Sequence, residues 1–470
     1  MTDDVDSPAE SNQRLTRREI LYGSSFMMAG VAGCIGDGGD GDALPEEMSF
    51  LHFETDQVRR DTIDEIAQPW TEETGVSLNQ RAISEDSLPT TIGSDAAAGT
   101  LPATAELSSR ALFSARGIVN RDDATQVVEN IGEDAFYDRV LQFVSDGDGN
   151  YLGAPLYVWT QMLGYDETHR QDNELPVPDT WDDFETFAEE SHDPDNDQYG
   201  CLLGSDTSQF TLQCFQPFAL SNDAHVFDED GNIVFDEQPM VEALEFYGRM
   251  CRNYNPTGGR VGSGDVDPIW TNQQTYLYST NTVGFWFEAA FIDEKVEGFG
   301  VVPQIDGPEK QTTFGEVVST TTFDVGEGAR EASRSFQEHL HSTDGDADSP
   351  LITFLHLRPG LFNPAQEDIL NSEAYLDDVN EEVYPESNTD PGRSPGGVID
   401  SWPAEWHEEI IPNSIGTMER FGRRGDQVFP EIGDITGNFL ITDAIQAVID
   451  GTDPETAASN AADEMRDQIS

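Results

Sequence analysis

One short segment of the chain has the residue pattern of a nucleophilic catalyst. Residues 392–396 read Gly-Arg-Ser-Pro-Gly and satisfy GxSxG, in which the serine attacks an acyl carbon. That chemistry needs a strand before the serine and a helix after it, whereas prolines on both sides of Ser394 are typical of a loop. We therefore expect no catalytic serine. A carboxylate pair for glycoside hydrolysis stays open, because a chain with 91 acidic residues offers many such pairs.

Three other segments have the residue types of metal or nucleotide sites, and each departs from its pattern. Residues 193–204 begin like a calcium loop, but Gln198 and Gly204 stand where that loop needs Gly and Glu. His339 and His341 have no third ligand of matching spacing. Residues 36–41 fit GxGxxG without a strand before or a helix after them. The sequence therefore predicts no metal site and no cofactor.

The N-terminal segment has the features of an export signal. Arg17 and Arg18 precede a weakly apolar run over 20–33, which is typical of twin-arginine export. Val-Ala-Gly-Cys at its end resembles a lipobox, so we expect Cys34 to carry a lipid anchor at the outer face of the cytoplasmic membrane. The alternative is a poorly packed N-terminal helix. We assign 1–34 to the signal with its lipobox and 35–47 to a flexible acidic Gly/Asp linker.

The charge balance indicates a protein that works in concentrated salt. The chain has 91 acidic and 24 basic residues, a net charge of −67, and the acids are spread along its whole length. Their repulsion is tolerable where salt shortens the Debye length to about 3 Å. The same balance argues against a nucleic-acid partner, which would need a basic surface. Because 37% of the residues are hydrophobic and 26 are Phe, the chain can build a core and is not a disordered acidic tail.

The length of the chain predicts two lobes. Its 470 residues exceed the roughly 250–300 that a single core supports. After the signal, no apolar run reaches the length of a transmembrane helix. Two alternatives stay open for Cys201, Cys214 and Cys251. They are one disulfide, with Cys201 and Cys214 the nearest pair in sequence, or buried free thiols.

Hydrophobic periodicity predicts an α/β fold. A strand at 48–53, a helix over 57–73 and a strand at 76–81 form a βαβ unit, which implies a parallel sheet. A short strand at 105–107 and a helix over 109–117 follow. Further on, the sequence predicts hairpin turns at 146–150 and 228–232, and helices starting at Thr180 and over 239–252, 443–449 and 454–469.

Several motifs follow one another in the order of a known family. They are Gly-Thr-Leu-Pro at 99–102, where Ala103 replaces an expected Asp, Tyr-Leu-Gly-Ala-Pro at 151–155, Pro-Asp-Thr-Trp-Asp-Asp-Phe at 178–184, Gly-Phe-Trp at 284–286 and Phe-Gly-Val-Val-Pro at 299–303. The ordered set resembles the extracellular solute-binding proteins of ABC importers, in the branch that includes the maltose-binding proteins. Together with the N-terminal signals, it resembles the haloarchaeal lipoprotein type.

The resemblance implies a two-lobed clamshell of the type II periplasmic-binding-protein class. The chain crosses between lobes more than once, and solute binds in the cleft. We expect 48–156 plus 297–346 in lobe 1 and 157–296 plus 347–470 in lobe 2. The family's role implies a monomer that delivers its solute to the permease subunits of an ABC importer, without catalysis of its own.

The resemblance also points to ligand-binding residues. A sugar offers a C–H face to aromatic rings and a hydroxyl rim to carboxylates, amides and Arg. Trp286 falls on the family's Gly-x-Trp position, where sugar-binding members stack a ring. Trp159 falls in a hinge-side loop where the maltose binders carry Glu, and Phe421 falls near another aromatic contact. We interpret Trp70 and Trp181 as core residues.

Polar contacts are expected from the first lobe. Glu54, Thr55 and Asp56 follow the first strand, and Glu316 follows the second entry into that lobe. The alternative for each acid is a solvated surface position, because acids occur everywhere in this chain. We interpret the protein as a receptor for a sugar or oligosaccharide. Another small solute in the same clamshell (an amino acid, polyamine or phosphate ester) and a secreted carbohydrate-active enzyme stay open as alternatives.

Overall fold

The computed structural model describes residues 43–84, 87–256, 260–281, 298–343, 349–358, 362–377, 403–425 and 427–469. The predicted export signal with Arg17, Arg18 and Cys34 lies outside these residues. The same holds for Trp286 and for the GxSxG segment at 392–396. The statements below concern the described residues. None of their helices is long and apolar enough to cross a membrane.

The predicted βαβ unit is confirmed. Strands β1 (Glu47–His52) and β2 (Ser77–Ala82) pair in parallel, and helix α2 (Gln57–Thr74) connects them. Helix α2 begins after Asp56, whose carboxylate accepts the Val58 N–H at 2.9 Å. Strand β3 (Thr104–Ser108) pairs in parallel with the other side of β1, as expected for the third strand.

Two long antiparallel strands continue this sheet and were not predicted. Strand β8 (Gln311–Thr322) pairs with β3 on one side and with β4 (Ala154–Asp166) on the other, and β5 (Leu277–Asn281) pairs with β4. The sheet is therefore mixed, in the order β2-β1-β3-β8-β4-β5. Shorter strands extend it: β6 (Phe299–Val302), β7 (Ile305–Asp306), β9 (Asn363–Pro364) and β10 (Met418–Glu419).

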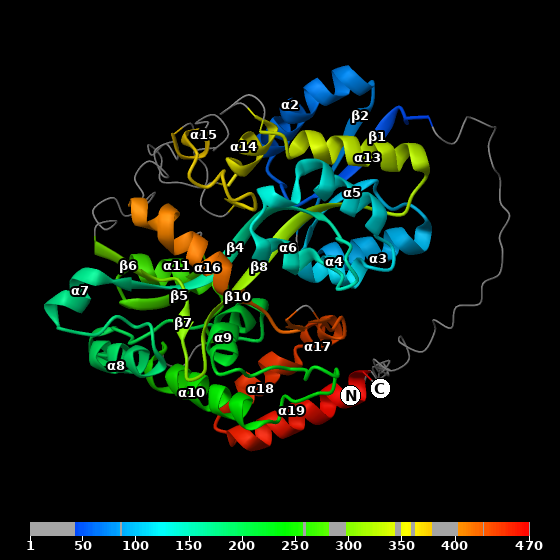
Figure 1. Ribbon diagram of the computed structural model, residues 1–470. Helices are drawn as coiled ribbons and strands as arrows, with labels where there is room; N and C mark the ends of the chain where they lie inside the picture. Colours follow the sequence, from blue (N-terminus) through cyan, green and yellow to red (C-terminus); the bar gives the residue numbers. More distant parts are fainter. Residues whose placement is uncertain are drawn as a thin grey trace, which may run out of the picture. The chain divides into compact units, whose positions relative to one another are not determined.

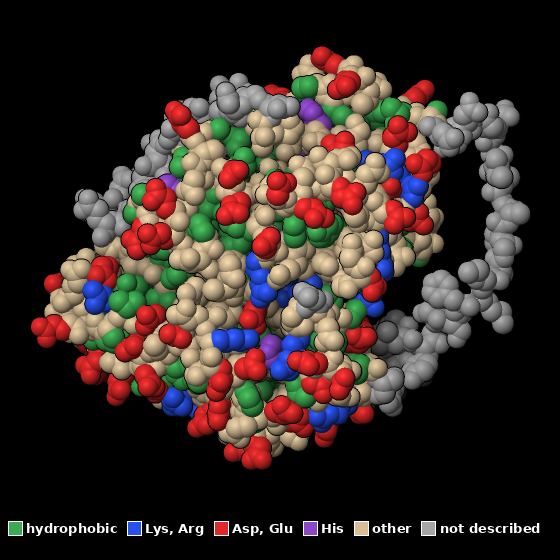
Figure 2. All heavy atoms as spheres, viewed as in Figure 1, with side chains coloured by type: hydrophobic (Ala, Val, Ile, Leu, Met, Phe, Trp, Pro, Cys, Tyr) green, Lys and Arg blue, Asp and Glu red, His purple; other side chains and the backbone are tan. Residues whose placement is uncertain are grey.

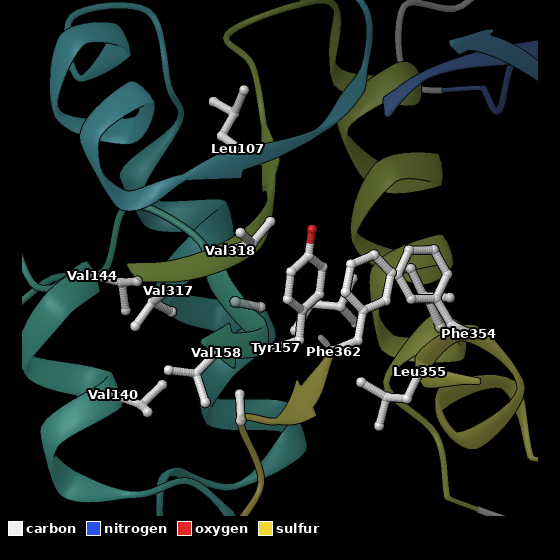
Figure 3. Close-up of a cluster of buried hydrophobic side chains, with 14 of the residues drawn as sticks. Leu107, Val140, Val144, Tyr157, Val158, Val317, Val318, Phe354, Leu355 and Phe362 are labelled. Carbon is white, nitrogen blue, oxygen red and sulfur yellow. The ribbon is translucent and has the colours of Figure 1, made fainter. Parts of the chain in front are cut away.

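The buried hydrophobic side chains form two clusters, and β4 and β8 run between the helices that surround them (Figure 1). In the first cluster, the rings of Tyr157 and Phe362 stack at 3.8 Å beside valines of β4 and β8 (Figure 3). Its helices are α2, α3 (Leu88–Ala98), α4 (Ser109–Ala115), α5 (Arg121–Ile131), α6 (Asp138–Val144), α11 (Ser263–Thr271), α13 (Glu327–Leu340), α14 (Pro350–Leu355), α15 (Glu373–Asp377) and α16 (Ile411–Thr417).

The second cluster is built mainly from helices near the C-terminus and the middle of the chain. Cys201, Cys214 and Cys251 are buried in it as free thiols. Its helices are α8 (Trp181–Ser191), α9 (Gln209–Ser221), α10 (Gln238–Tyr254), α17 (Ile432–Gly437), α18 (Leu440–Ile449) and α19 (Pro454–Ile469). The short helix α7 (Glu167–Asp172) follows β4, and β11 (Arg423–Arg424) pairs with β12 (Gln427–Val428).

The lobe boundaries stay a prediction. Helix α14 and the residues after it contribute Leu351, Phe354 and Phe362 to the cluster that also contains α2. The same cluster also contains Trp270 and Trp406, from segments that we expected in the second lobe, so it does not divide the chain into the two predicted lobes.

Local predictions from turns and helix ends are confirmed. Short antiparallel bridges close both predicted turns, at 146–150 and 228–232. The Thr180 hydroxyl caps α8 by accepting the Asp183 N–H at 3.1 Å. Trp70 is buried, and Trp181 is half-buried and stacks on Phe246 at 4.5 Å.

Candidate functional site

The two central strands bring a predicted aromatic residue and a predicted acid together. In the antiparallel register of β4 and β8, Trp159 lies opposite Glu316, and Thr160 lies opposite Gly315. These positions are far apart in sequence, so only the strand pairing makes them neighbours. The ring of Trp159 also meets Phe314 edge-on, with centroids 5.7 Å apart.

Strand β10 approaches β8 closely at this point because β8 has a glycine there, Gly315. Strand β10 pairs in parallel with β8, with Glu419 opposite Phe314. A Cβ at Gly315 would lie 2.5 Å from the Met418 sulfur, so a larger residue would push β10 away. The close approach carries the next residue, Arg420, to the carboxylate of Glu316.

Arg420, Glu316 and Ser109 form a buried polar cluster. The Arg420 guanidinium donates to Glu316 Oε1 at 2.8 Å, and both side chains are at most 10% exposed. The Ser109 hydroxyl, at the start of α4, donates to the same carboxylate oxygen, and Arg420 donates to that hydroxyl. The buried pair carries no net charge, because the Glu316 carboxylate and the Arg420 guanidinium neutralise each other.

Glu316 and Arg420 line a cavity of about 210 Å³, together with Trp159 and Phe314. Helices α9 and α17 and the start of α11 also line it. The side chains that line the cavity are mainly aromatic, apolar or uncharged polar. They are Trp159, Gln209, Phe210, Leu212, Gln213, Gln216, Ser263, Phe314, Glu316, Arg420, Phe421, Ile432 and Thr436.

Helix α9 presents amides to the cavity at helical spacing. Gln209, Gln213 and Gln216 all line it, since residues four and three positions apart share a helix face. The side-chain oxygen of Gln216 accepts the Phe421 N–H at 2.7 Å, which fixes its orientation. The side chains of Gln209 and Gln213 are half-buried and make no hydrogen bond to another residue that the structure describes. Their amides therefore remain available to a bound molecule.

The structure brings together some of the predicted site residues. Trp159, Glu316 and Phe421 line the cavity, although Phe421 is only 3% exposed and also packs in the second cluster. Trp286 lies outside the described residues. The interpretation of Glu316 as a solvated acid is wrong, because it is 6% exposed and ion-paired.

Glu54, Thr55 and Asp56 do not line this cavity. Glu54 is completely buried and pairs with Arg59 at 3.2 Å and Arg358 at 2.7 Å, so the solvated alternative is wrong for this acid as well. Thr55 is exposed, and Asp56 is the N-cap of α2. All three stay predictions as ligand contacts.

A second buried acid lies near Glu54 and belongs to the first cluster rather than to the cavity. Glu106 accepts the Tyr157 hydroxyl at 2.7 Å and the Phe53 N–H at 3.1 Å. Burial raises the pKa of Glu106 to about 7, and the neighbouring Glu54 carboxylate acts in the same direction. Glu106 therefore changes its charge near neutral pH.

The sequence did not single out Arg420, Phe314 or the α9 amides. Gln209, Gln213 and Gln216 have the spacing of one helix face, which is a signal that periodicity alone could have found. Nothing local in the sequence marks Arg420, because its place depends on the pairing of β10 with β8. Among the residues that the structure describes, no group of three His, Cys, Asp or Glu side chains is placed to hold a metal ion.

Comparison with known proteins assigns the family. The family model described as "Bacterial extracellular solute-binding protein" matches residues 56–344, more than half of the chain. The chain belongs to this family. The predicted resemblance is therefore confirmed, and both the family and the fold are those of binding proteins.

Individual relatives of this solute-binding protein agree with that assignment. It is 26% identical over 434 residues to YcjN of Escherichia coli K12, named as a provisional ABC transporter periplasmic-binding protein, with 90% of this chain and 92% of YcjN covered. A Thermotoga lettingae ABC transporter solute-binding protein bound to α-D-tagatose has a TM-score of 0.68 at 16% identity, covering 91% of this chain and all of that one. T. maritima MalE3 bound to maltose has a TM-score of 0.67 at 15% identity, with 89% and 99% covered. The predicted α/β solute-binding-protein fold is confirmed.

Proposed function

We propose that this solute-binding protein captures a neutral, polyhydroxylated solute, a sugar, for an ABC importer. The observation that carries this proposal is the pairing of Glu316 with Arg420 at 2.8 Å. Of the described residues that line the cavity, these two are the only charged ones. A charged solute would need an unmatched opposite charge there, since a buried charge without a partner costs several kcal/mol, about 3–5 when one member of a buried pair is removed.

The remaining lining residues suit the two chemical faces of a sugar. Trp159 and Phe314 offer aromatic surface to the C–H face of a ring. The amides of Gln209 and Gln213 each offer donors and an acceptor, as hydroxyl groups require. A volume of about 210 Å³ is below the ~300–1,000 Å³ of pockets for drug-sized ligands, which favours a small sugar over a long oligosaccharide.

The relatives support the same solute class. Two solved structures with this fold, those of the Thermotoga lettingae protein and of MalE3, contain tagatose and maltose as bound molecules. By analogy we extend this chemistry to the present chain, together with Trp286 as a further stacking residue. Export by the twin-arginine route, a lipid on Cys34 and delivery to permease subunits complete the proposal, with hinge closure of two lobes around the solute.

A thermal-shift panel in concentrated KCl tests the proposed function. The panel contains neutral monosaccharides, disaccharides and polyols, with amino acids, a polyamine and sugar phosphates as charged comparisons. At about 100 times its Kd, the true ligand should add about 2.7 kcal/mol to the free energy of unfolding. Stabilisation by neutral sugars supports the proposal. Stabilisation only by a charged solute, or hydrolysis of an added glycan, contradicts it.

A further inference from the structure

We propose that a basic patch beside the cavity docks an acidic segment of a partner protein. The basic patch consists of Arg139, Lys310, Arg423 and Arg424. This inference rests on the proposed function in one respect, namely that the expected partner is the membrane component that receives the solute. The location and the chemistry of the docking surface follow from the structure of this chain.

Ion pairs and shared neighbours hold the basic patch together. Lys310 lies 3.3 Å from Asp223 and 2.9 Å from Glu419, and Arg424 lies 3.8 Å from the same Asp223. The Asp223 carboxylate thus connects Lys310, directly before β8, with Arg424 of β11. His225 lies against Asp223 as well, at 3.0 Å.

Two further arginines complete the patch, Arg139 of α6 and Arg423 of β11, of which Arg423 is buried. Arg139 and Arg423 both lie over the ring of Phe143, at 5.8 and 5.7 Å. Arg139 donates to the Met418 carbonyl at 2.7 Å, and Arg423 donates to the carbonyl of Ser145. The patch therefore joins α6 of the first cluster with elements packed on the second cluster.

The local charge balance reverses that of the whole molecule. Across the chain, 91 acidic residues stand against 24 basic ones, whereas here Lys310 and Arg424 share Asp223, and Arg139 and the buried Arg423 lie together over Phe143. Figure 2 shows Lys and Arg side chains grouped near the centre of this face, over the region of β10 and α17, while acidic side chains cover much of the rest. The side chains of Lys310 and Arg424 are each 31% exposed and can therefore contact a partner.

Asp223 lies at the centre of the patch, directly after the C-cap of α9. Asp223 has a φ of 53°, in the left-handed region that non-glycine residues rarely adopt. In this position the Asp223 carboxylate holds Lys310 and Arg424 side by side.

The patch shares two structural elements with the solute cavity. Helix α9 lines the cavity at Gln209 and ends at Ser221, beside Asp223. The segment 418–424 places Arg420 in the cavity and Glu419, Arg423 and Arg424 in the patch. A partner bound at the patch therefore contacts the same elements that the solute contacts, which allows it to distinguish the loaded from the empty protein.

An acidic protein segment fits the patch better than an anionic membrane does. A flat lipid surface would face many of the acids of a molecule with net charge −67, and these repel it. A narrow acidic segment can reach Lys310 and Arg424 without approaching the acidic surroundings. Charge complementarity of this kind fixes register and partner choice.

Fluorescence anisotropy of a labelled deca-glutamate peptide with the full chain tests the proposal. At about 1 M KCl the Debye length is about 3 Å, so the overall repulsion is screened. We expect Lys310→Gln/Arg424→Gln to weaken peptide binding about tenfold, because two partly exposed ion pairs are lost. Arg424→Lys should keep the wild-type affinity. A matched control is Arg249→Gln/Arg260→Gln, which removes similarly exposed arginines elsewhere and should leave binding unchanged.

Three results would overturn the docking proposal. They are equal peptide binding by the wild type and the Lys310→Gln/Arg424→Gln variant, no peptide binding by the wild type, and binding to phosphatidylglycerol vesicles in place of the peptide. The sugar-induced thermal shift, measured on the same samples, keeps the two claims separate. If no sugar shifts the wild type while the peptide result holds, the proposed function fails and the docking surface stands.

Discussion

Replacing Glu316 by Gln should change the kind of solute that the cavity accepts. In the wild type the Glu316 carboxylate neutralises Arg420 at 2.8 Å, with both side chains at most 10% exposed. Glu316→Gln keeps the shape of the side chain and removes its charge. The cavity then contains an arginine without a carboxylate partner among the described lining residues.

The size of the effect follows from burial. Breaking a buried ion pair by removing one partner costs about 3–5 kcal/mol, and we expect about 3 because the introduced amide oxygen still accepts a hydrogen bond from Arg420. A solute carboxylate that binds beside the unneutralised Arg420 makes a hydrogen bond to a charged group, worth about 1.5–3 kcal/mol. The variant should therefore prefer an anionic sugar by roughly 10- to 100-fold.

The assay compares two solutes on the wild type, the Glu316→Gln variant and a control variant by thermal shift and calorimetry. The solutes are the neutral sugar that stabilises the wild type most and its uronic acid. The control variant is Glu185→Gln, which removes the carboxylate 2.8 Å from Arg249 outside the cavity, with both side chains about a third exposed. It should cost under about 1 kcal/mol and change no solute preference. If Glu316→Gln keeps the wild-type preference for the neutral sugar, then the Glu316–Arg420 pair is not the reason why the cavity selects neutral solutes, and the reasoning is refuted.

Three further predictions concern stability. Gly315→Ala should lower the free energy of unfolding by about 1–3 kcal/mol because a Cβ there meets Met418, whereas Gly416→Ala, with open space around it, should not destabilise; chemical denaturation measures both. Because burial raises the pKa of Glu106 from 4.5 to about 7, its contribution to stability is present below pH 4.5 and is lost as the pH rises through 7. Melting curves from pH 5 to 8 should therefore show that Glu106→Gln becomes more stable relative to the wild type as the pH rises, by up to about 3 kcal/mol. The same dependence of stability on pH in both proteins would contradict this. Burial raises the pKa of the Cys214 thiol to about 12, so maleimide should label it only on unfolding, and rapid labelling of the native protein would refute its buried position.

Local chemistry made much of the fold predictable. The unit formed by β1, α2 and β2 follows from periodicity within 36 residues, Glu47 to Ala82. The capping of α8 by Thr180 and the turns at 146–150 and 228–232 depend on residue types within a few positions. Such features need no knowledge of distant parts of the chain.

Long-range pairing and charge placement were not predictable in the same way. Strand β4 pairs with β8, more than 140 residues away, and this pairing alone places Trp159 beside Glu316. The position of Arg420 depends on a further pairing, between β10 and β8. In a chain with 91 acids, residue type alone does not separate Glu54 and Glu316, which are buried and paired, from the exposed majority.

A crystal structure of the complex with the most stabilising sugar tests the central claim most directly. We predict electron density for the sugar in the cavity, with a ring face against Trp159 and hydroxyl groups within hydrogen-bond distance of Gln213 and Arg420. Density for the sugar at another place on the protein, with this cavity closed by side chains, would contradict the account.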